Sequence, residues 1–290
     1  MQPITAEQPG HKLTPLPKPL PKPLPTWIKL RIALIKPLHR GKVIVLPFGR
    51  ILKMNAPANE MASMEFVRAN TTIPVPKILD IYELQPDGSA HILMTRVQGT
   101  LFSHALHTMN PVQVQSVVSD LSGYLAQMHR LTQPTQAPTS QGPTIGGTTQ
   151  GPGYDHSLGS YVWGPFPTVA DFHTYVRFGE PLEDWVHEPA VMEVHAKPEA
   201  YRVRYSHADL APHNIIVDPK AGKITGIIDW EFGGWYPEYW EYIKIHYAPR
   251  RQWAEYYAAI DKEEGIQKYP KEQAAEEVIW LRAGPFGYDR

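Results

Sequence analysis

Apolar and polar residues alternate in short runs near the start of the chain, and a helical spacing follows. Residues 41–55, GKVIVLPFGRILKMN, contain two alternating runs separated by PFG, which predicts two short antiparallel strands. Residues 58–70, ANEMASMEFVRAN, place Glu60, Met64 and Val67 on one face, and this spacing predicts a helix. A strand pair followed by one helix is therefore expected.

The alternating pattern returns after this helix. Residues 71–79, TTIPVPKIL, are expected to be extended because each proline disfavours helical backbone in the residue before it. Residues 81–97, IYELQPDGSAHILMTRV, predict a hairpin whose turn is PDG. The first hundred residues thus predict a small antiparallel sheet accompanied by one helix.

Beyond Gly99 the pattern becomes helical. Asn110 is a favourable N-cap, and Pro111 suits the first turn of a helix. The apolar stripe of this helix consists of Val114, Val117, Val118, Leu121, Leu125 and Met128. Residues 132–164, rich in Pro, Gly, Thr and Gln, predict a long loop, and residues 168–180 predict another helix.

A polar cluster interrupts the apolar pattern in residues 205–218, YSHADLAPHNIIVD. Its flanks alternate in period two or are β-branched, so the cluster is predicted to be a loop between strands, where chemistry is commonly located. A turn at DPKAGK and a returning strand, ITGIID, follow, and this hairpin should bring Asn214 and Asp229 together. The remainder of the chain is expected to be helical.

The composition of the chain argues against several kinds of partner, chemistry and location. The formal net charge is −1, so neither nucleic acid nor an anionic membrane is expected as a partner. The absence of cysteine excludes disulfides and thiolate chemistry. No apolar run approaches the roughly 20 residues that cross a bilayer, and the N-terminus lacks the apolar core of a secretory signal. We therefore expect a cytoplasmic protein.

Residues 1–26 are dominated by the stretch KLTPLPKPLPKPLPT. Alternating prolines fix φ and remove amide donors, so an extended, polyproline-II-like arm is expected. We expect this arm to be a solvated tail. The alternative is that it is a ligand for a proline-binding module.

Four separated features combine into one chemical hypothesis. Asn214 and Asp229 offer the oxygen ligands that Mg²⁺ takes. Asp209 would lie beyond the metal and accept or orient a substrate hydroxyl. Lys53, at the end of a strand, would neutralise phosphate charge, and Glu60 on the next helix would hold this lysine. Phosphoryl transfer depends mainly on positioning and charge stabilisation, so these residues indicate a phosphotransferase.

Two of these assignments have alternatives in the sequence. His207 and His213 together with Asp209 could bind a metal instead, although that hypothesis leaves the other features without roles. Glu65 competes with Glu60 as the partner of the lysine. Glu60 is favoured because it shares a helix face with apolar residues.

Acidic and aromatic residues after the hairpin have open roles. Glu231 is either a second metal contact or a solvated acid at a strand end. Trp235 and Tyr236 are expected to pack in the core, with a place in an acceptor pocket as the alternative. Glu238 and Glu241 could give such a pocket the negative charge that a polycationic acceptor requires.

These features together resemble the aminoglycoside phosphotransferase family, which is related to the protein kinases. The resemblance rests on Lys53, Glu60, the loop HADLAPHN and the strand end IIDWE. The amino-acid sequence of these motifs, together with the downstream GGWYPEYWEY, is most similar to that of fungal members of the family. The resemblance extends from about Val43 to at least Tyr242 and includes MTRVQG, which is similar to the hinge between the kinase lobes.

The resemblance implies an α+β, two-lobed protein-kinase-like fold. Its N-lobe, residues 27–95, would be a small antiparallel sheet with a helix, and its C-lobe, residues 100–290, would be mainly helical. In the hinge, residues 95–99, the backbone of Thr95 and Val97 would face adenine. ATP and Mg²⁺ are the implied cofactors, and the hydroxyl of a small molecule is the implied acceptor.

The resemblance also implies a role for each residue of the site. Asp209 would be the catalytic carboxylate. Asn214 and Asp229 would bind Mg²⁺, and Lys53, held by the helix glutamate, would contact the nucleotide phosphates. His207 would be structural and hold the loop.

The chain departs from the family pattern in two main respects and one minor one. No Gly-x-Gly-x-x-Gly loop is present between residues 38 and 52, where only Gly41 and Gly49 are available to cover phosphates, and the first N-lobe strand is not evident. Ala208 replaces the usual glycine between His and Asp, a minor change if its φ is negative. The missing loop supports an alternative function, a pseudokinase-like binding or regulatory module with a degraded nucleotide site.

Overall fold

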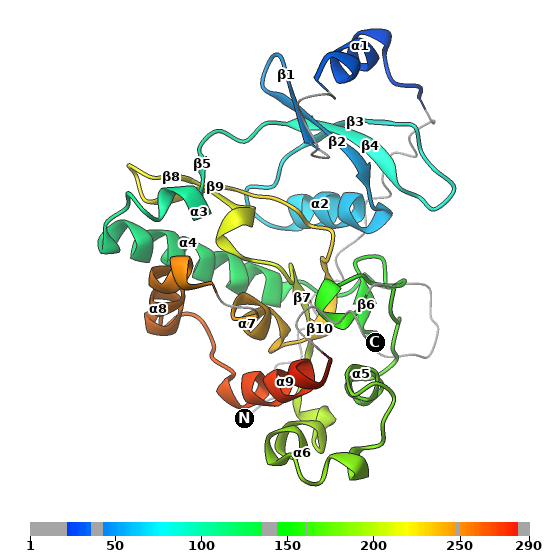
Figure 1. Cartoon of the computed structure of the whole chain (residues 1–290), viewed down its shortest axis with the longest axis vertical. Coiled ribbons are helices and arrows are strands. Elements are labelled where there is room, and N and C mark those ends of the chain that lie inside the picture. Colours follow the sequence, from blue (N-terminus) through cyan, green and yellow to red (C-terminus); the bar gives the residue numbers. More distant parts are fainter. Residues whose placement is uncertain (1–21, 36–42, 135–143, 160–161, 248–249, 284–290) are drawn as a thin grey trace, which may run out of the picture.

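The computed structural model describes residues 22–35, 43–134, 144–159, 162–247 and 250–283. Figure 1 shows a small lobe, drawn in blue and cyan at the top, and a larger lobe below it. The large lobe contains most of the helices, and the small lobe contains the larger antiparallel sheet. The expected two-lobed α+β fold is confirmed.

The small lobe is a four-stranded antiparallel sheet accompanied by two helices. Its strands lie in the order β1-β2-β4-β3. Its elements are α1 (Thr26–Ile35), β1 (Val43–Leu46), β2 (Arg50–Ala56), α2 (Ala58–Asn70), β3 (Ile78–Tyr82) and β4 (Ala90–Thr95). The strand pair around PFG, the helix at 58–70 and the PDG hairpin are all present as predicted.

The two faces of this sheet have different partners because successive side chains of β2 point to opposite sides. Leu52 is fully buried and packs with Leu24 and Ile28 of the α1 region. Ile51 packs against the main core instead. Lys53, two residues further on, shares the face of Ile51 and is therefore directed toward the rest of the molecule.

The N-terminal part of the small lobe differs from the kinase-like pattern. In the described part of the chain a helix, α1, precedes β1 and packs on one face of the sheet through Ile28. Residues 22–25, the end of the predicted proline-rich arm, are attached to the lobe, since Lys22 forms a parallel bridge with Tyr82 and Leu24 is buried. Residues 1–21 lie outside the described residues.

The connection between the lobes follows a constrained path. The hydroxyl of Thr225 donates to the carbonyl of Gln98 at 2.7 Å. Gly99 has φ +132°, and a Cβ at this position would lie 2.5 Å from the carbonyl oxygen of Val217. Only glycine permits so close an approach. Residues 95–99 are thus tied to the sheet of the large lobe that contains β8 and β9.

The large lobe combines helices with two three-stranded sheets, ordered β6-β10-β7 and β5-β8-β9. Its elements are β5 (Thr100–Leu101), α3 (Phe102–Ala105), α4 (Pro111–Arg130), β6 (Gly146–Gly147), α5 (Val169–Val176), α6 (Pro189–His195), β7 (Val203–Ser206), β8 (Ile215–Asp218), β9 (Lys223–Ile227), β10 (Gly234–Pro237), α7 (Trp240–Ile245), α8 (Ala254–Lys262) and α9 (Pro270–Ala283). As predicted, α4 begins after Asn110, which forms a capping box with Gln113.

Two segments of the large lobe differ from the prediction. The loop expected at 132–164 includes β6, which pairs with β10 and so belongs to a sheet. The residues after the second hairpin were expected to be helical, but β10 is the middle strand of its sheet. The sequence of β10, GWYP, did not predict a strand because glycine and proline are unfavourable within strands.

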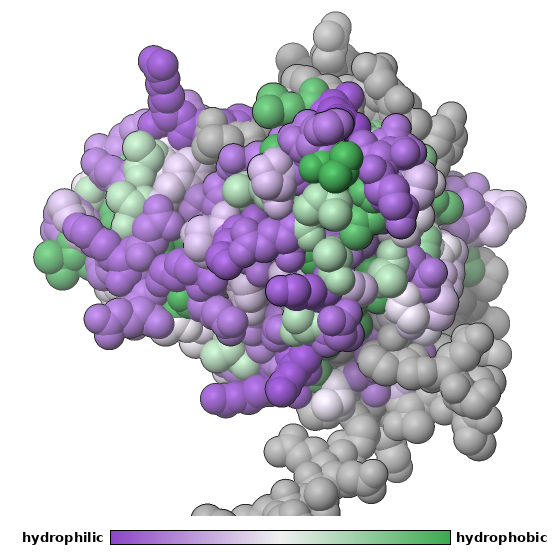
Figure 2. Space-filling model, turned by 90° about the horizontal axis from the view of Figure 1, so that it is seen from below, coloured by the Kyte–Doolittle hydropathy of each residue, from purple (hydrophilic) through white to green (hydrophobic). Residues whose placement is uncertain are grey.

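Apolar side chains are mostly enclosed within the molecule. One continuous core extends through both lobes. The face seen in Figure 2 is predominantly hydrophilic, and its apolar residues form small separate patches. Within the described residues, every helix is too short or too polar to cross a bilayer.

Candidate active site

Lys53 is held between two carboxylates that come from different lobes. Its Nζ lies 2.6 Å from Oε1 of Glu60 and 2.6 Å from Oδ1 of Asp229. The first contact joins β2 to α2, and the second joins the small lobe to the residue shortly after β9. Of the two glutamates considered from the sequence, Glu60 rather than Glu65 is the one placed against the lysine.

Burial and the neighbouring opposite charges have opposing effects on the pKa values of Lys53 and Glu60. Burial disfavours the charged ammonium, but Glu60 and Asp229 outweigh it and raise the pKa of Lys53. Burial raises the pKa of Glu60 to about 7 despite the lysine, and Asp229 and Glu231 add to the rise. Lys53 is therefore a permanent cation at neutral pH, whereas Glu60 titrates near neutrality.

The loop HADLAPHN is fixed to the end of the hairpin through His207. The backbone N–H of Asp209 donates to Nδ1 of His207 at 3.2 Å, and Nε2 of His207 donates to the carbonyl of Ile228 at 3.0 Å. Burial lowers the pKa of His207, so the ring is neutral. Both ring nitrogens are engaged, and the alternative metal site formed by His207, His213 and Asp209 is not supported.

Asn214 joins this loop to the same point of the hairpin. Its Nδ2 donates to the backbone carbonyl of Asp209 at 3.0 Å and to Oδ2 of Asp209 at 2.7 Å. Its own backbone carbonyl accepts from the N–H of Ile228 at 3.0 Å. Since Asp229 directly follows Ile228, the pairing predicted from the hairpin places Asn214 and Asp229 at the same end of the ladder.

The carboxyl group of Asp209 is accessible and charged. Its side chain is 31% exposed, and Nε2 of His213 lies 3.8 Å from its Oδ2. Burial would raise the pKa of Asp209, but the side-chain contact with His213 and the positive charge of Lys244 hold it below its ordinary value. The group can therefore accept a proton or orient a hydroxyl at neutral pH.

Glu241, a buried glutamate of α7, fixes the backbone of the loop HADLAPHN. Oε2 of Glu241 accepts hydrogen bonds from the backbone N–H groups of His207 and Ala208. Glu241 is 2% exposed, and with Glu238 it lines a pocket beside α4 and α7, so its suggested contribution to an acceptor pocket stays a prediction. The residues are 33 and 34 positions apart, and no sequence signal revealed a contact that only tertiary packing creates.

We expect Glu241→Gln to flatten the pH dependence of stability. Burial raises the pKa of Glu241 from 4.5 to about 7, so the folded state retains a proton that the unfolded chain loses. The free energy of unfolding of the wild type therefore falls as pH rises from about 4.5 to 7, by about 3 kcal/mol. Urea unfolding across this range measures the effect, with the exposed Glu264→Gln as control. Identical pH profiles for wild type and Glu241→Gln would contradict it.

Ala208, between the histidine and the aspartate, has left-handed backbone. Its φ is +62°, so the condition under which alanine would be a minor replacement for glycine is not met. Left-handed backbone costs an ordinary residue about 1–2 kcal/mol, and Ala208 is fully buried. Asp229 has a similar φ of +67°, which aspartate and asparagine tolerate better than most residues.

Substitutions at Ala208 should separate this strain from packing. Ala208→Val is expected to destabilise by at least about 3 kcal/mol, because a β-branched residue at positive φ is strained and the site has no spare volume. Ala208→Gly should stay within about 1 kcal/mol of wild type, because relief of strain offsets lost burial and added chain entropy. The control is Ala211→Val, at φ −87° and ψ 156° in the same loop. Equal unfolding midpoints for the two valine variants would refute this account.

One group of acidic atoms in the described residues has the spacing of a cation site. Carboxylate oxygens of Glu60, Asp229 and Glu231 lie within 4.8 Å of one another. Glu231 is therefore part of the acidic group beside Asp229, and of its two suggested roles this position favours that of a second metal contact.

The aromatic residues after the hairpin are structural. Trp235 and Tyr236 are each 1% exposed, which confirms the core assignment. Nε1 of Trp235 donates to the carbonyl of Thr148 at 3.2 Å, and the hydroxyl of Tyr236 donates to the carbonyl of Phe232 at 2.8 Å. Glu238 accepts a hydrogen bond from a backbone N–H at 3.4 Å.

The turn between β1 and β2 does not occupy the place of a phosphate loop. The carbonyl of Gly49 accepts from the N–H of Arg96 at 2.8 Å, so the turn lies beside the hinge. Lys53 pairs with Val43, at the other end of the two strands. Gly41, the other glycine considered in this region, lies outside the described residues.

Comparison with known proteins gives matches over most of the chain. Residues 41–275 match the model of the phosphotransferase enzyme family (APH). The structure is similar to that of aminoglycoside phosphotransferase APH(4)-Ia, with a TM-score of 0.57 and 16% identity over 89% of this chain and 90% of that chain. It is also similar to the apo form of a thermostable mutant of that enzyme, with a TM-score of 0.54 and 17% identity over 84% and 82%. At these identities the structural likeness concerns the fold.

Proposed function

Because the chain belongs to the phosphotransferase enzyme family, we propose that it is an ATP- and magnesium-dependent O-phosphotransferase that acts on a hydroxyl of a small molecule. The main support is the contact between Lys53 of the small lobe and Asp229 of the large lobe, 2.6 Å apart across 176 positions. Ile228 ties Asp229 to the loop that carries Asp209 and Asn214. A cation, a reactive carboxylate and two magnesium-type ligands thus belong to one constellation.

An uncovered apolar surface beside Lys53 supports a nucleotide base. Val45 pairs with Ile51, and Val43 pairs with Lys53, so these four side chains share one face of the strand pair. Val43 is 38% and Val45 46% exposed. The flat apolar face of adenine would cover this surface, with its phosphates extending toward the lysine.

The hinge offers backbone groups of matching polarity. The N–H of Thr95 donates to the carbonyl of Lys77 at 2.9 Å, so the carbonyl of Thr95 is the group that would accept from the base. Val97 packs its side chain against Gly226, where a Cβ would lie 2.6 Å from it. The N–H of Val97 would be the donor to the base.

The donor set beside the lysine fits Mg²⁺, which takes few protein ligands, all of them oxygen. Because Nδ2 of Asn214 is bonded to Asp209, its Oδ1 remains as the ligand atom. Asp229 would supply a carboxylate oxygen, and Glu231 lies close enough to assist. The ion would neutralise charge on the phosphate oxygens.

Asp209 would act on the acceptor hydroxyl. The bond from Nδ2 of Asn214 fixes the carboxylate, and the backbone bond to His207 fixes the loop that carries it. The low pKa of Asp209 keeps the carboxylate charged. Asp209 would orient the hydroxyl toward the terminal phosphoryl group and receive its proton. Lys53 would stabilise the phosphate charge on the other side. The near-neutral net charge of the chain leaves the acceptor class open to neutral metabolites as well as aminoglycosides.

The test is magnesium-dependent formation of ADP from ATP across a panel of hydroxylated acceptors that includes aminoglycosides. Turnover should require Mg²⁺ and be lost in Asp229→Asn, which preserves the positive φ that asparagine tolerates. Absence of turnover with every acceptor would overturn the proposed activity.

A thermal-shift assay distinguishes the pseudokinase alternative, which the missing Gly-x-Gly-x-x-Gly motif supports. ATP with Mg²⁺ at about 100 times its dissociation constant should stabilise the protein by about 2.7 kcal/mol. Stabilisation without turnover would support a binding module. If neither stabilisation nor turnover were observed, the result would count against the presence of any nucleotide site.

A further inference from the structure

We propose that Asn59 is a positioning residue for the candidate Mg²⁺ site, an inference that rests on the proposed function. Asn59 lies in the first turn of α2, directly before Glu60. Its Nδ2 donates to the backbone carbonyls of Glu231 and Gly233, at 3.0 Å and 2.8 Å. Both carbonyls belong to the segment that follows Asp229. One side-chain amide of the small lobe thus holds the backbone that carries two of the candidate metal carboxylates.

The orientation of this amide follows from its three partners. Oδ1 of Asn59 accepts from the backbone N–H of Thr148 at 3.0 Å. If the amide were reversed, its oxygen would face two carbonyl oxygens and its NH₂ group would face an N–H group. An aspartate could not donate to the two carbonyls, and an apolar residue could serve none of the three partners. The contacts are therefore specific to a side-chain amide.

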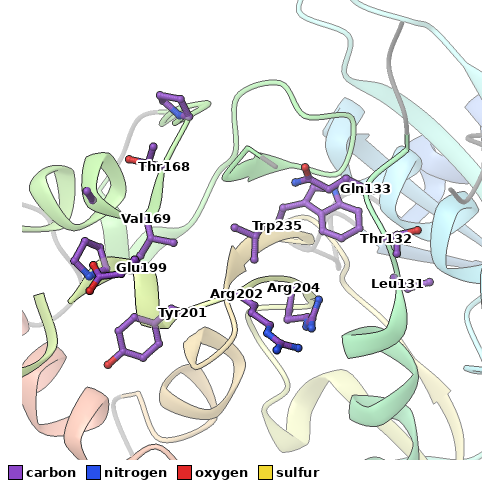
Figure 3. Close-up of a pocket in the computed structure, with 14 residues that line it drawn as sticks. Leu131, Thr132, Gln133, Thr168, Val169, Glu199, Tyr201, Arg202, Arg204 and Trp235 are labelled. Carbon is purple, nitrogen blue, oxygen red and sulfur yellow. The ribbon is translucent and has the colours of Figure 1, made fainter. Parts of the chain in front are cut away.

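Thr148, the third partner, is itself fixed in the large lobe. It directly follows β6 and is fully buried. Its carbonyl accepts from Nε1 of Trp235 at 3.2 Å, and its hydroxyl is bonded to the hydroxyls of Ser63 and Tyr205 at 2.7 Å and 2.8 Å. Trp235 also forms part of the wall of a cavity beside β7 (Figure 3). Asn59 is therefore held against a buried part of the sheet β6-β10-β7.

The backbone held by Asn59 determines where two carboxylates lie. Glu231 is bonded through its own carbonyl, and Asp229 is two residues earlier, with left-handed backbone at φ +67°. Carboxylate oxygens of these two residues lie within 4.8 Å of each other and of one from Glu60. Like charges this close repel one another, so their proximity needs a restraint from the backbone. The two hydrogen bonds from the amide supply this restraint.

Calorimetry with the non-hydrolysable ATP analogue AMP-PNP tests this role in the full chain, once in EDTA and once in saturating Mg²⁺. The ratio of the two dissociation constants measures the coupling between nucleotide and cation. Removal of a group that orients metal ligands typically weakens metal binding about 10–100-fold. We expect Asn59→Ala to lower the ratio about tenfold, the lower end of this range, because the amide acts on the backbone of the ligands. Affinity in EDTA should be unchanged, because Lys53 keeps its partner Glu60.

Asn70→Ala is the matched control. It removes the same amide at the other end of α2, where Nδ2 donates to the carbonyl of Phe66 at 2.7 Å within the helix, and both asparagines are half-buried. This control should keep the wild-type ratio. Asn59→Ser retains one donor, should give an intermediate ratio, and decides the matter if Asn59→Ala is unfolded.

The possible failures are distinguishable. A wild-type ratio in a folded Asn59 variant would refute the role of Asn59 and leave the proposed function standing. Equal losses of affinity in EDTA and in Mg²⁺ would show that Asn59 only holds the lobes together, which would also overturn the inference. If the wild type bound AMP-PNP no better in Mg²⁺ than in EDTA, the proposed magnesium site would fail, and the inference with it.

Discussion

Asp209→Asn is expected to lower kcat for phosphoryl transfer by about 10²–10⁴-fold, the usual contribution of a positioned acid–base group. Asparagine has nearly the same shape and still offers an oxygen to Nδ2 of Asn214, which lies 2.7 Å from the native carboxylate. It cannot accept the proton of the acceptor hydroxyl. The change should therefore remove chemistry and leave nucleotide binding and folding in place, which steady-state kinetics and an ATP thermal shift measure together.

The control for this loss is Asp184→Asn, an exposed aspartate in the large lobe. It makes the same chemical change far along the chain from the loop HADLAPHN and should leave kcat within about twofold. If Asp209→Asn turned over substrate as fast as Asp184→Asn, Asp209 would not be the reacting carboxylate. A thermal shift lost together with kcat would instead indicate that the loop had collapsed.

The parts of the site that were predictable from the sequence are those built from local structure. Lys53 and Glu60 are seven positions apart in a strand and the following helix, and both elements have clear hydrophobic periodicity. Asn214 and Asp229 belong to one hairpin, whose pairing follows from its turn and its β-branched strands. In each case a short segment with a regular pattern determines the relative position of both residues.

The parts that were not predictable depend on contacts between distant segments. Glu241 reaches the backbone of residues 207 and 208 only because α7 packs beneath the loop. The positive φ of Ala208 is imposed by this environment, since alanine has no intrinsic preference for it. The strand β10 is recognised only through its partners β6 and β7, because local propensity argues against it.

The conformation at the start of the small lobe also depends on contacts between distant segments. The stretch WIKLRIALI, residues 27–35, was assigned no helix or strand from the sequence, and the first N-lobe strand was not evident. In the structure Ile28 is fully buried with Leu52 and Leu93, and α1 lies on the sheet. A second apolar surface, the outer face of the sheet, therefore determines which conformation this stretch adopts.

Lys53→Met is expected to destabilise the protein by about 3 kcal/mol at pH 8 and to abolish the thermal shift by ATP. Breaking a buried ion pair from one side leaves an uncompensated charge and typically costs about 3–5 kcal/mol. Glu60 is 1% exposed, but Asp229 is 39% exposed at its side chain and can be solvated, so the lower end applies. Urea unfolding and thermal shift at pH 6 and pH 8 measure both effects.

The pH dependence of this variant identifies the group responsible. Without the lysine, the pKa of Glu60, already about 7, should rise further. The destabilisation should therefore be smaller at pH 6, where Glu60 is largely protonated in both proteins, than at pH 8. Lys53→Met/Glu60→Gln should recover stability at pH 8 but not the ATP shift, which separates the structural role of the lysine from its role toward phosphate. Lys223→Met breaks a pair whose lysine is 57% exposed and should cost much less, because solvent screens such pairs. If Lys53→Met cost no more than this surface control at pH 8, the two carboxylates would not depend on the lysine, and the link between the lobes on which the proposed site rests would have to be reassigned.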